Sequence, residues 1–154
     1  MTQKTQLTLA QIMLPHQANL GGNVHGGEIF KLMDMTAGAV CQQYANTTIV
    51  TARVDDMRFT NPVYVGDHVR CTARIICVGS TSMDVLITVD AENLKTGEEW
   101  RKVASAFSTH VSIGGDGKPK KVAPLVIETE EQRNLFALAQ KRRADYKSRE
   151  QIDY

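Results

Sequence analysis

One apolar helical segment followed by four β-rich segments most limits the folds open to this chain of 154 residues. Between residues 26 and about 44, apolar side chains recur every three or four positions, which is the period of a helix. These positions are Ile29, Met33, Ala37 and Val40. Apolar neighbours widen this stripe until little polar surface remains, so we expect the helix to be enclosed on most of its sides.

Strands are predicted on both sides of this helix. Residues 5–13 predict a first strand, and segments rich in β-branched residues predict strands over 48–59, 67–79, 82–93 and 98–113. In the two middle segments apolar and polar residues alternate, so one face of each strand is expected to meet a core. Short connections with glycine or proline join the four later segments, as expected for antiparallel neighbours.

A sheet with one apolar face must cover that face, and the apolar helix supplies the cover. We therefore predict an α+β fold in which a long antiparallel sheet wraps around a central helix. The length is that of a single domain, which can bury roughly 70% of its unfolded surface without a disulfide or a metal. We assign this domain to residues 1–128 and assign residues 129–154 to a basic C-terminal helix and tail.

The C-terminal segment carries its own helix signal. Thr129 and Gln132 have the spacing of a capping box, which predicts a helix that ends near Lys147. Its apolar side consists of Leu135, Phe136, Leu138 and Ala139. Basic side chains gather near its end, and we interpret them as a solvated face in preference to a ligand site. They are Lys141, Arg142, Arg143 and Lys147.

Charge and cysteine content indicate the class of partner and the compartment. Lysine plus arginine (18) nearly balance aspartate plus glutamate (17), so no global field attracts nucleic acid or an anionic membrane. Three cysteines lie within apolar segments, as small buried side chains do in a reducing compartment. No segment approaches the ~18 apolar residues of a membrane span. We expect a cytoplasmic protein that has neither nucleic acid nor a membrane as its partner.

Two glycines, Gly26 and Gly27, stand where a loop becomes the apolar helix. Unpaired backbone N–H groups and the positive end of the helix dipole favour partial negative charge there, such as that of a polarised carbonyl oxygen. Glycine also lets a substrate approach the backbone closely. Glycine content alone favours a flexible turn, so the functional interpretation depends on the neighbouring residues.

Asp34 is a carboxylate within the apolar helix, and the residues one turn away on either side are apolar or small. That setting predicts a desolvated carboxyl group. Desolvation increases the basicity that a general base or a nucleophile needs. The alternative is a structural acid that pairs with a cation such as Lys31.

The distance between these two features predicts how a site is assembled. Asp34 lies seven residues beyond Gly27, which is roughly 10 Å along one helix axis at ~1.5 Å rise per residue. An acid at that distance does not serve its own helix start. Two chains related by a twofold axis, with these helices antiparallel, would bring the acid of one chain to the helix start of the other. We therefore predict a site shared between two subunits, in a pairing that also protects sheet edges.

Other candidate residues surround the two glycines. Asn19 and Asn23 can hold a water or donate to a carbonyl, although loop asparagines usually bond their own backbone. His25 is a candidate general acid or base, although a loop histidine is more often a hydrogen-bonding residue. The four histidines and three cysteines lack metal-site spacing, and we predict no metal. The sequence also lacks a serine nucleophile elbow and phosphate-binding glycine motifs, which argues against serine triads and nucleotide hydrolysis.

A family resemblance covers roughly residues 7–140. It is carried by the segments "LPHQANLGGNVHGGEIFKLMD", "VTARVDDMRFTNPVYVGDHV", "STSMDVLI", "ASAFSTHVSI" and "DGKPKKVAPL". The chain resembles the hotdog-fold acyl-CoA thioesterases of the cytosolic, brain-type acyl-CoA hydrolase family. The resemblance implies the hotdog fold, hydrolysis of acyl-CoA to a free fatty acid and CoA, and homodimers assembled as a trimer of dimers. It also implies a shared site with Asn19 and Asp34 as its catalytic residues.

The residues and the resemblance together suggest a mechanism. The amides of Gly26 and Gly27 would polarise the thioester carbonyl, while the partner chain's Asp34 would activate water or attack directly. Both routes stay open. CoA is part of the substrate and the product, so no separate cofactor is expected. The residues expected to contact the substrate or its CoA part are Asn23, His25, Gly26, Gly27, Arg58, Gly79, Ser80, Thr81 and Ser82.

Two alternatives keep the same residues and change their use. A hotdog hydroxyacyl dehydratase or hydratase would use His25 and Asp34 as an acid–base pair on a hydroxyacyl chain. A non-enzymatic acyl-CoA sensor would bind its ligand at the glycine-rich loop without hydrolysing it.

Overall fold

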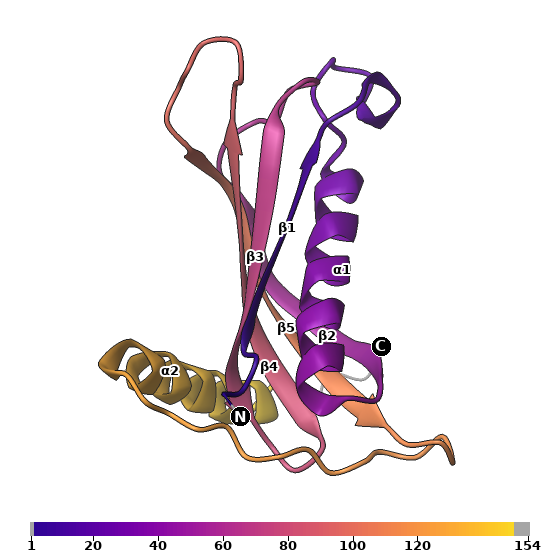
Figure 1. The fold of residues 1–154 in the computed structure, drawn as a ribbon, viewed down its shortest axis with the longest axis vertical. Coiled ribbons are helices and arrows are strands. Elements are labelled where there is room, and N and C mark those ends of the chain that lie inside the picture. The colour runs from indigo at the N-terminus through magenta and orange to yellow at the C-terminus, as the bar shows by residue number, and fades with distance from the viewer. Residues whose placement is uncertain (1, 150–154) are drawn as a thin grey trace.

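A computed structural model describes residues 2–149 of the chain. One five-stranded antiparallel sheet separates two helices, with α1 on its inner face and α2 on its outer face (Figure 1). In chain order the elements are β1 (Gln6–Ile12), the 3-10 turn η1 (Pro15–Gln17), α1 (Gly26–Ala45), β2 (Thr48–Phe59), β3 (His68–Val78), β4 (Ser82–Glu92), β5 (Arg101–Ile113) and α2 (Glu130–Lys147).

The predicted helices and strands are present, with bounds close to the expected ones. The largest difference is at the start of β5, which begins at Arg101 instead of residue 98. Buried and less buried positions alternate along most of β3 and β4, as predicted from their apolar and polar residues. The buried face of these strands packs against α1 in one hydrophobic core.

The order of the strands corrects one prediction. The sheet order is β1-β3-β4-β5-β2, so β2 pairs with β5 and is separated from β3 by two strands. The connection over residues 60–67 therefore crosses one end of the sheet instead of forming a hairpin, as the top of Figure 1 shows. The short length of this connection did not make β2 and β3 neighbours, because β1 pairs with β3 along the whole length of β1 and occupies the edge of β3 that β2 was expected to take.

The crossing loop holds the start of α1 in place. Val63 accepts a hydrogen bond at 2.8 Å from the backbone N–H of Val24, just before the helix. Further along, the buried carboxylate of Asp67 accepts a hydrogen bond at 2.9 Å from the N–H of Tyr64 and pairs with Arg101 of β5. Removing one partner of such a pair leaves a buried charge, which is strongly destabilising. The loop is therefore a fixed part of the region around the helix start.

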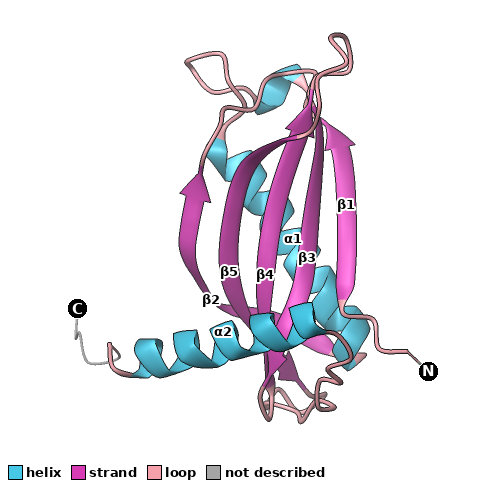
Figure 2. Cartoon of the chain, turned by 90° about the vertical axis from the view of Figure 1, so that its left-hand side faces the viewer, coloured by secondary structure: helices cyan, strands magenta, loops and turns pink. Residues whose placement is uncertain are grey.

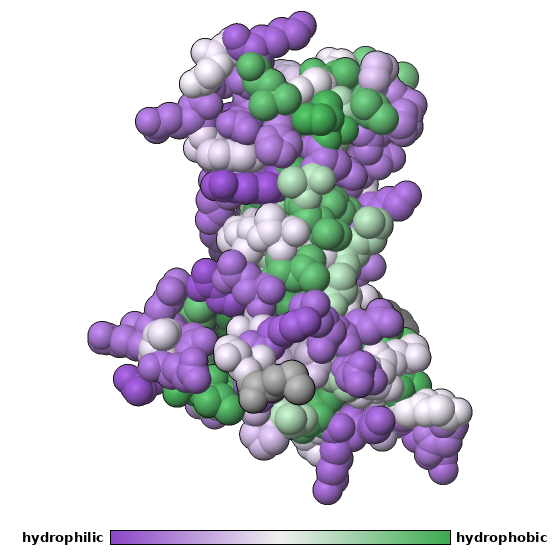
Figure 3. Space-filling view, in the orientation of Figure 1, coloured by the Kyte–Doolittle hydropathy of each residue, from purple (hydrophilic) through white to green (hydrophobic). Residues whose placement is uncertain are grey.

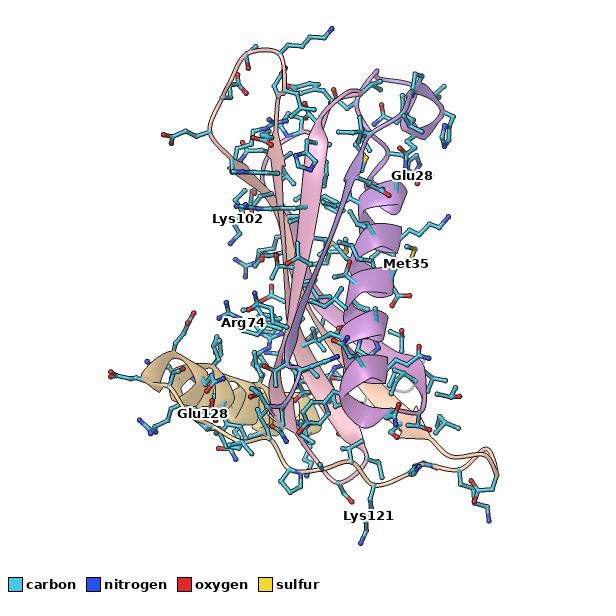
Figure 4. The ribbon with its side chains drawn as sticks, viewed as in Figure 1. Glu28, Met35, Arg74, Lys102, Lys121 and Glu128 are labelled. Carbon is cyan, nitrogen blue, oxygen red and sulfur yellow. The ribbon has the colours of Figure 1, made fainter. Side chains whose placement is uncertain are left out.

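The sheet covers one side of α1, which corrects the prediction of a helix enclosed on most sides. The side that faces the sheet buries Ile29, Leu32, Met33, Thr36, Ala37, Val40 and Cys41. On the other side, Phe30 is 39% exposed and Met35 is 51% exposed, and Met35 projects away from the sheet in Figure 4. Hydrophobic surface runs along the face that carries α1 in Figure 3. A single chain thus leaves apolar helix surface uncovered, as interaction surfaces do.

The C-terminal helix crosses the outer face of the sheet near one end of the strands (Figure 2). A second, small core joins it to the sheet through Ile76, Cys77 and Ala139, with Leu86, Phe107, Leu135 and Phe136 packed around them. The predicted capping box is confirmed, with the Gln132 N–H donating to Thr129 Oγ1 at 3.1 Å. Leu138 is 41% exposed, which corrects its assignment to the apolar side, because it lies on the flank of the stripe that packs on the sheet.

Two members of the basic cluster of α2 are ion-paired, which corrects their interpretation as solvated. Arg142 pairs with Asp55 at 2.7 Å, and Arg143 pairs with Asp84. The two lysines of the cluster are exposed, as predicted. Both acids project from the outer face of the sheet, from β2 and β4, so these pairs attach α2 to the sheet.

Candidate active site

The start of α1 borders an open hollow of about 370 Å³. The loop before α1, the first turns of α1, and the end of β2 with the residues after it contribute to its walls. The lining includes Asn19, Asn23, Gly26, Ile29, Phe59 and Val63. The structure therefore brings three of the predicted site residues, Asn19, Asn23 and Gly26, to one concave surface.

The side chain of Asn19 is oriented by the loop that contains it. Its Oδ1 accepts hydrogen bonds from the backbone N–H of Gly21 at 2.9 Å and of Asn23 at 3.2 Å. This is the usual role of a loop asparagine, and the network assigns which end of the amide is oxygen. Across residues 2–149 no partner is found for Nδ2. Its two hydrogens therefore remain available to a ligand in the hollow.

The two glycine amides at the helix start differ. His25 is the N-cap residue of α1, and its Nδ1 accepts a hydrogen bond from the Gly27 N–H at 2.9 Å. The Gly26 N–H has no partner in the part of the chain that the structure describes. A Cβ at Gly26 would stand 3.5 Å from the ring of Phe59, in ordinary van der Waals contact with it. The free donor at the helix start is therefore the amide of Gly26.

Asp34 is half-buried and bonded to a hydroxyl group instead of a cation. The Thr51 Oγ1 of β2 donates to Asp34 Oδ1 at 2.8 Å. No ion pair of Asp34 occurs among the described residues, and Lys31, its candidate cation, is exposed. The neighbouring Phe30 and Met35 are exposed in the single chain, so the chain's own packing does not desolvate this carboxyl as predicted.

Sequence reasoning missed Thr51, and a β-bulge explains why. The pairing of β2 with β5 shifts between Thr51 and Arg53, so Ala52 is an extra residue in β2. Without a bulge, Thr51 and Arg53 would point to the same face, because side chains alternate along a strand. With it, Thr51 reaches α1, whereas Arg53 reaches α2, where its guanidinium lies 3.5 Å from the ring centroid of Tyr146. No residue type in this segment predicts such a bulge.

Asp34 is separated from the hollow along α1. It lies eight residues beyond Gly26, which is about 12 Å at ~1.5 Å rise per residue. It is likewise nine residues beyond His25, or roughly 13 Å, which excludes an acid–base pair of these two residues within one chain. One chain therefore contains both halves of the predicted site without bringing them together.

The expected CoA contacts, Arg58 and the turn of residues 79–82, are both linked to α2. Arg58 forms an exposed ion pair with Asp56 at 3.0 Å, and the same carboxylate is 3.4 Å from Arg142 of α2. The next residue of the helix, Arg143, donates to the last residue of the turn at 3.1 Å. Arg58 and this turn therefore lie near α2 on the same side of a single chain.

The turn of residues 79–82 is bonded within the chain. A Cβ at Gly79 would stand 2.7 Å from Nη1 of Arg143. Nη2 of the same guanidinium donates to Ser82 Oγ at 3.1 Å. The backbone oxygens of Ser80 and Thr81 accept hydrogen bonds from later backbone N–H groups at 3.0 and 2.9 Å. These contacts give the turn a structural role in holding α2.

Metal, thiol and membrane features were also assessed for residues 2–149. In that range no group of three histidine, cysteine, aspartate or glutamate side chains could hold a metal ion. Burial raises the pKa of the Cys71 thiol to about 11 and raises the pKa of Cys41 further, so both thiols are protonated near neutral pH. No helix in the same range is long and apolar enough to cross a membrane.

Comparison with known families identifies the class of the domain. Residues 21–98, about half of the chain, match the family model described as Thioesterase superfamily. The chain belongs to the thioesterase superfamily. The matched region of this thioesterase-superfamily chain contains the helix start, Asp34 and Thr51.

Two curated relatives have informative names. The chain is 35% identical over 148 residues to the cytosolic acyl coenzyme A thioester hydrolase of Mus musculus, covering 96% of this chain and 39% of that protein. It is 32% identical over 130 residues to the acyl-CoA thioester hydrolase YciA of Salmonella typhimurium, covering 82% of this chain and 95% of that protein. The chain thus spans about two fifths of the length of the mammalian relative.

A solved structure agrees with the fold. The chain superposes with a TM-score of 0.91 on the crystal structure of an apo-hexameric acyl-CoA thioesterase, at 30% identity, covering 97% of this chain and 96% of the other. The predicted hotdog fold, with a long antiparallel sheet around a central helix and a C-terminal helix, is confirmed.

Proposed function

We propose that this protein is an acyl-CoA thioesterase that hydrolyses fatty acyl-CoA to a free fatty acid and CoA. The observation that carries this function is the half-buried Asp34, which has a hydroxyl donor and no cation in the described chain. A cation would stabilise the ionised carboxylate and weaken it as a base. The names of the mammalian and bacterial relatives support acyl-CoA as the substrate class.

The site is formed by two chains. A twofold axis that sets two α1 helices antiparallel would place the Asp34 of one chain near the Gly26 hollow of the other. The exposed Phe30 and Met35 supply apolar surface for that contact, and β2 is an edge strand of the sheet that a second chain can cover. Each homodimer would hold two complete sites. A trimer of such dimers agrees with the hexameric relative.

The mechanism uses the free donors at the hollow. The Gly26 amide and Asn19 Nδ2 would bind the thioester carbonyl oxygen, and the helix dipole would stabilise the negative charge that develops there. Asp34 would take a proton from water as its oxygen attacks the carbonyl carbon, or would attack directly to form an anhydride that water then opens. The carbon–sulfur bond breaks, and the CoA thiolate leaves and is protonated. The Gly27 N–H already donates to His25 Nδ1, so it supplies no donor to the substrate.

The remaining expectations extend this proposal. CoA enters with the substrate and leaves as the product, so the reaction uses no separate cofactor. Arg58 and the turn of residues 79–82 are the proposed contacts of its phosphates, with Asn23 and His25 beside the acyl end. We place the protein in the cytoplasm, as the name of the mammalian relative and the three free buried cysteines support.

Release of CoA from palmitoyl-CoA, followed with a thiol reagent, tests the function. Wild-type protein should release CoA, and Asp34→Ala should lose about 10³-fold in kcat while its oligomer, measured by light scattering, stays intact. Binding of palmitoyl-CoA without release would favour a sensor, and hydration of an enoyl-CoA without release would favour a hydratase. Full activity of Asp34→Ala would remove this residue from the mechanism.

A further inference from the structure

His110 is a fully buried imidazole near Asp34 that the mechanism above does not use. It lies on β5 directly opposite Thr51 of β2 and is 0% exposed. Its Nδ1 is 3.5 Å from Thr51 Oγ1, and its Nε2 is 2.9 Å from Ser108 Oγ. Together with Asp34, these side chains form a continuous line from the sheet interior to α1.

The hydrogens along this line have one consistent arrangement. An ionised carboxylate can only accept, so the Thr51 hydroxyl uses its hydrogen in the 2.8 Å bond to Asp34. A hydrogen bond between Thr51 and His110 must then be donated by Nδ1 of the imidazole. Burial lowers the pKa of His110, against opposing effects of Asp34 and Asp84, so the ring is neutral near pH 7 and carries one hydrogen.

The second ring nitrogen fits the same arrangement. With the hydrogen on Nδ1, Nε2 is an acceptor, and the Ser108 hydroxyl can donate to it at 2.9 Å. Donation then runs in one direction, from Ser108 to His110, from His110 to Thr51, and from Thr51 to Asp34. Reversing either bond of His110 would require the Thr51 hydroxyl to donate two bonds with one hydrogen, because the ionised Asp34 can only accept.

We propose that His110 is a positioning residue that holds the Thr51 hydroxyl on Asp34 by donating a hydrogen bond from Nδ1. The inference deepens the proposed function and rests on it, because Asp34 matters here as the reacting carboxylate. Thr51 lies at the edge of the sheet, where water competes for its hydroxyl and the hydroxyl could rotate away from Asp34. A buried donor behind it limits that rotation. One oxygen of Asp34 is then fixed, and the other is left to meet water or the carbonyl carbon.

A neutral donor that acts on Asp34 through the Thr51 hydroxyl suits this role. A cation in contact with Asp34 would favour its ionised form and reduce its basicity. On the outer face, Arg143 does make such contact with Asp84, and that pair attaches a helix. The Thr51 hydroxyl between His110 and Asp34 orients the carboxylate without neutralising it.

Two variants of similar shape separate the donor from the packing. Asparagine places its Nδ2 close to the position of the imidazole Nδ1, whereas leucine has nearly the same outline without a donor. His110→Leu should lower kcat for palmitoyl-CoA hydrolysis about tenfold with KM unchanged, while His110→Asn should stay within about threefold of wild type. A packing role would impair both variants alike, and a substrate-binding role would raise KM.

The tautomer can be measured on the unaltered protein. Long-range 1H–15N spectra of protein labelled with 15N-histidine report which ring nitrogen carries the hydrogen, and the signals missing in His110→Asn assign the residue. We expect the hydrogen on Nδ1, which is the form that free histidine favours less. A hydrogen on Nε2 would overturn the proposal whatever the activities are, including a case in which the leucine variant fails to fold.

Two serines on β5 supply a matched control. Ser108 and Ser112 are both buried, two residues to either side of His110 on the same face, and Ser112 Oγ has no hydrogen-bond partner in the described chain. Ser108→Ala should admit the other tautomer and lower kcat about threefold, whereas Ser112→Ala should change neither. Equal effects of the two serine variants, or a fully active His110→Leu, would contradict the proposal. Failure of the proposed function would instead show as an active Asp34→Ala, which leaves the tautomer result standing.

Discussion

The two helices lie on opposite faces of one sheet and differ in how their charges are met. On the outer face, Arg143 of α2 pairs with Asp84, and its neighbouring arginine pairs with another carboxylate of the sheet. On the inner face, Asp34 of α1 meets the hydroxyl of Thr51 and no cation in the described chain. Charges on the outer face therefore serve attachment, whereas the inner face leaves one carboxylate without a cation, as the proposed function requires.

The two faces also differ in completeness. The contacts of α2 with the sheet lie within one chain and include a small core of their own. α1 leaves Phe30 and Met35 exposed, and its free Gly26 amide is about 12 Å from Asp34 along the helix at ~1.5 Å per residue. Under the proposed function the inner face needs a second chain to complete its site, whereas the contacts of the outer face are complete within one chain.

Mixing two inactive variants gives the largest expected effect and tests the need for a second chain. Asn19→Ala and Asp34→Ala should each be nearly inactive alone, because each damages both sites of a homodimer. After the two are unfolded together and refolded, random pairing makes half of the dimers mixed, each with one intact site, so about a quarter of wild-type activity should return. CoA release by the mixture measures this recovery. An inactive mixture that contains mixed dimers would place the whole site within one chain and remove the contrast between the faces.

Removing a cation from the outer face should affect stability within the single chain. Arg143→Met leaves the carboxylate of Asp84 without its partner, and the side chain of Asp84 is 11% exposed. We expect a loss of about 2 kcal/mol in the free energy of unfolding, less than for a fully buried pair because Arg143 keeps 30% exposure. Urea unfolding measures it, with the exposed Lys141→Met on the same helix as the control. Equal stabilities of the two variants would mean that the ion pair does not hold α2.

The smallest expected effect is a pH dependence that belongs to the inner face. Burial lowers the pKa of His110 in the folded chain, while Asp34 and Asp84 oppose this shift. As pH falls below about 6.5, the unfolded chain binds a proton at this position that the folded chain resists, so the free energy of unfolding decreases. His110→Asn should remove that part of the decrease between pH 7.5 and 5.5, whereas His16→Asn, at an exposed position, should not. Parallel pH profiles of wild type and His110→Asn would contradict a neutral buried imidazole.

The sequence predicted the elements and the helix-on-sheet layering because these depend on local periodicity. The 3.6-residue period of α1 and the alternation in β3 are properties of neighbouring residues. The strand order was not predictable from connection length, because β1 competes for the edge of β3 that β2 was expected to occupy. Pairing over such distances depends on the whole sheet.

The residues of the candidate site also divide into those that the sequence could predict and those that depend on the pairing of the strands. Gly26 and Asp34 stand out because a glycine at a helix start and an acid within an apolar helix are unusual, whereas Asn19 was singled out as catalytic by the family resemblance. The structure gives each of the three a free or cation-free polar group. Thr51 and His110 do not stand out, because threonine and histidine are ordinary in strands and their meeting depends on register. The acids that meet α2 were missed for the same reason.

Because Ala52 is an extra residue in β2, Thr51 and Arg53 face different helices although one residue separates them. Loss of its codon would make Thr51 and Arg53 direct neighbours opposite His110 and Thr109. Adjacent residues of a strand point to opposite faces, so both side chains would keep their places. Substitution of Ala52 by another residue also changes neither face, since the backbone count is kept. In the history of this strand, both the identity and the presence of this residue are therefore open to change, whereas loss of a residue from a regularly paired stretch would turn every later side chain to the other face.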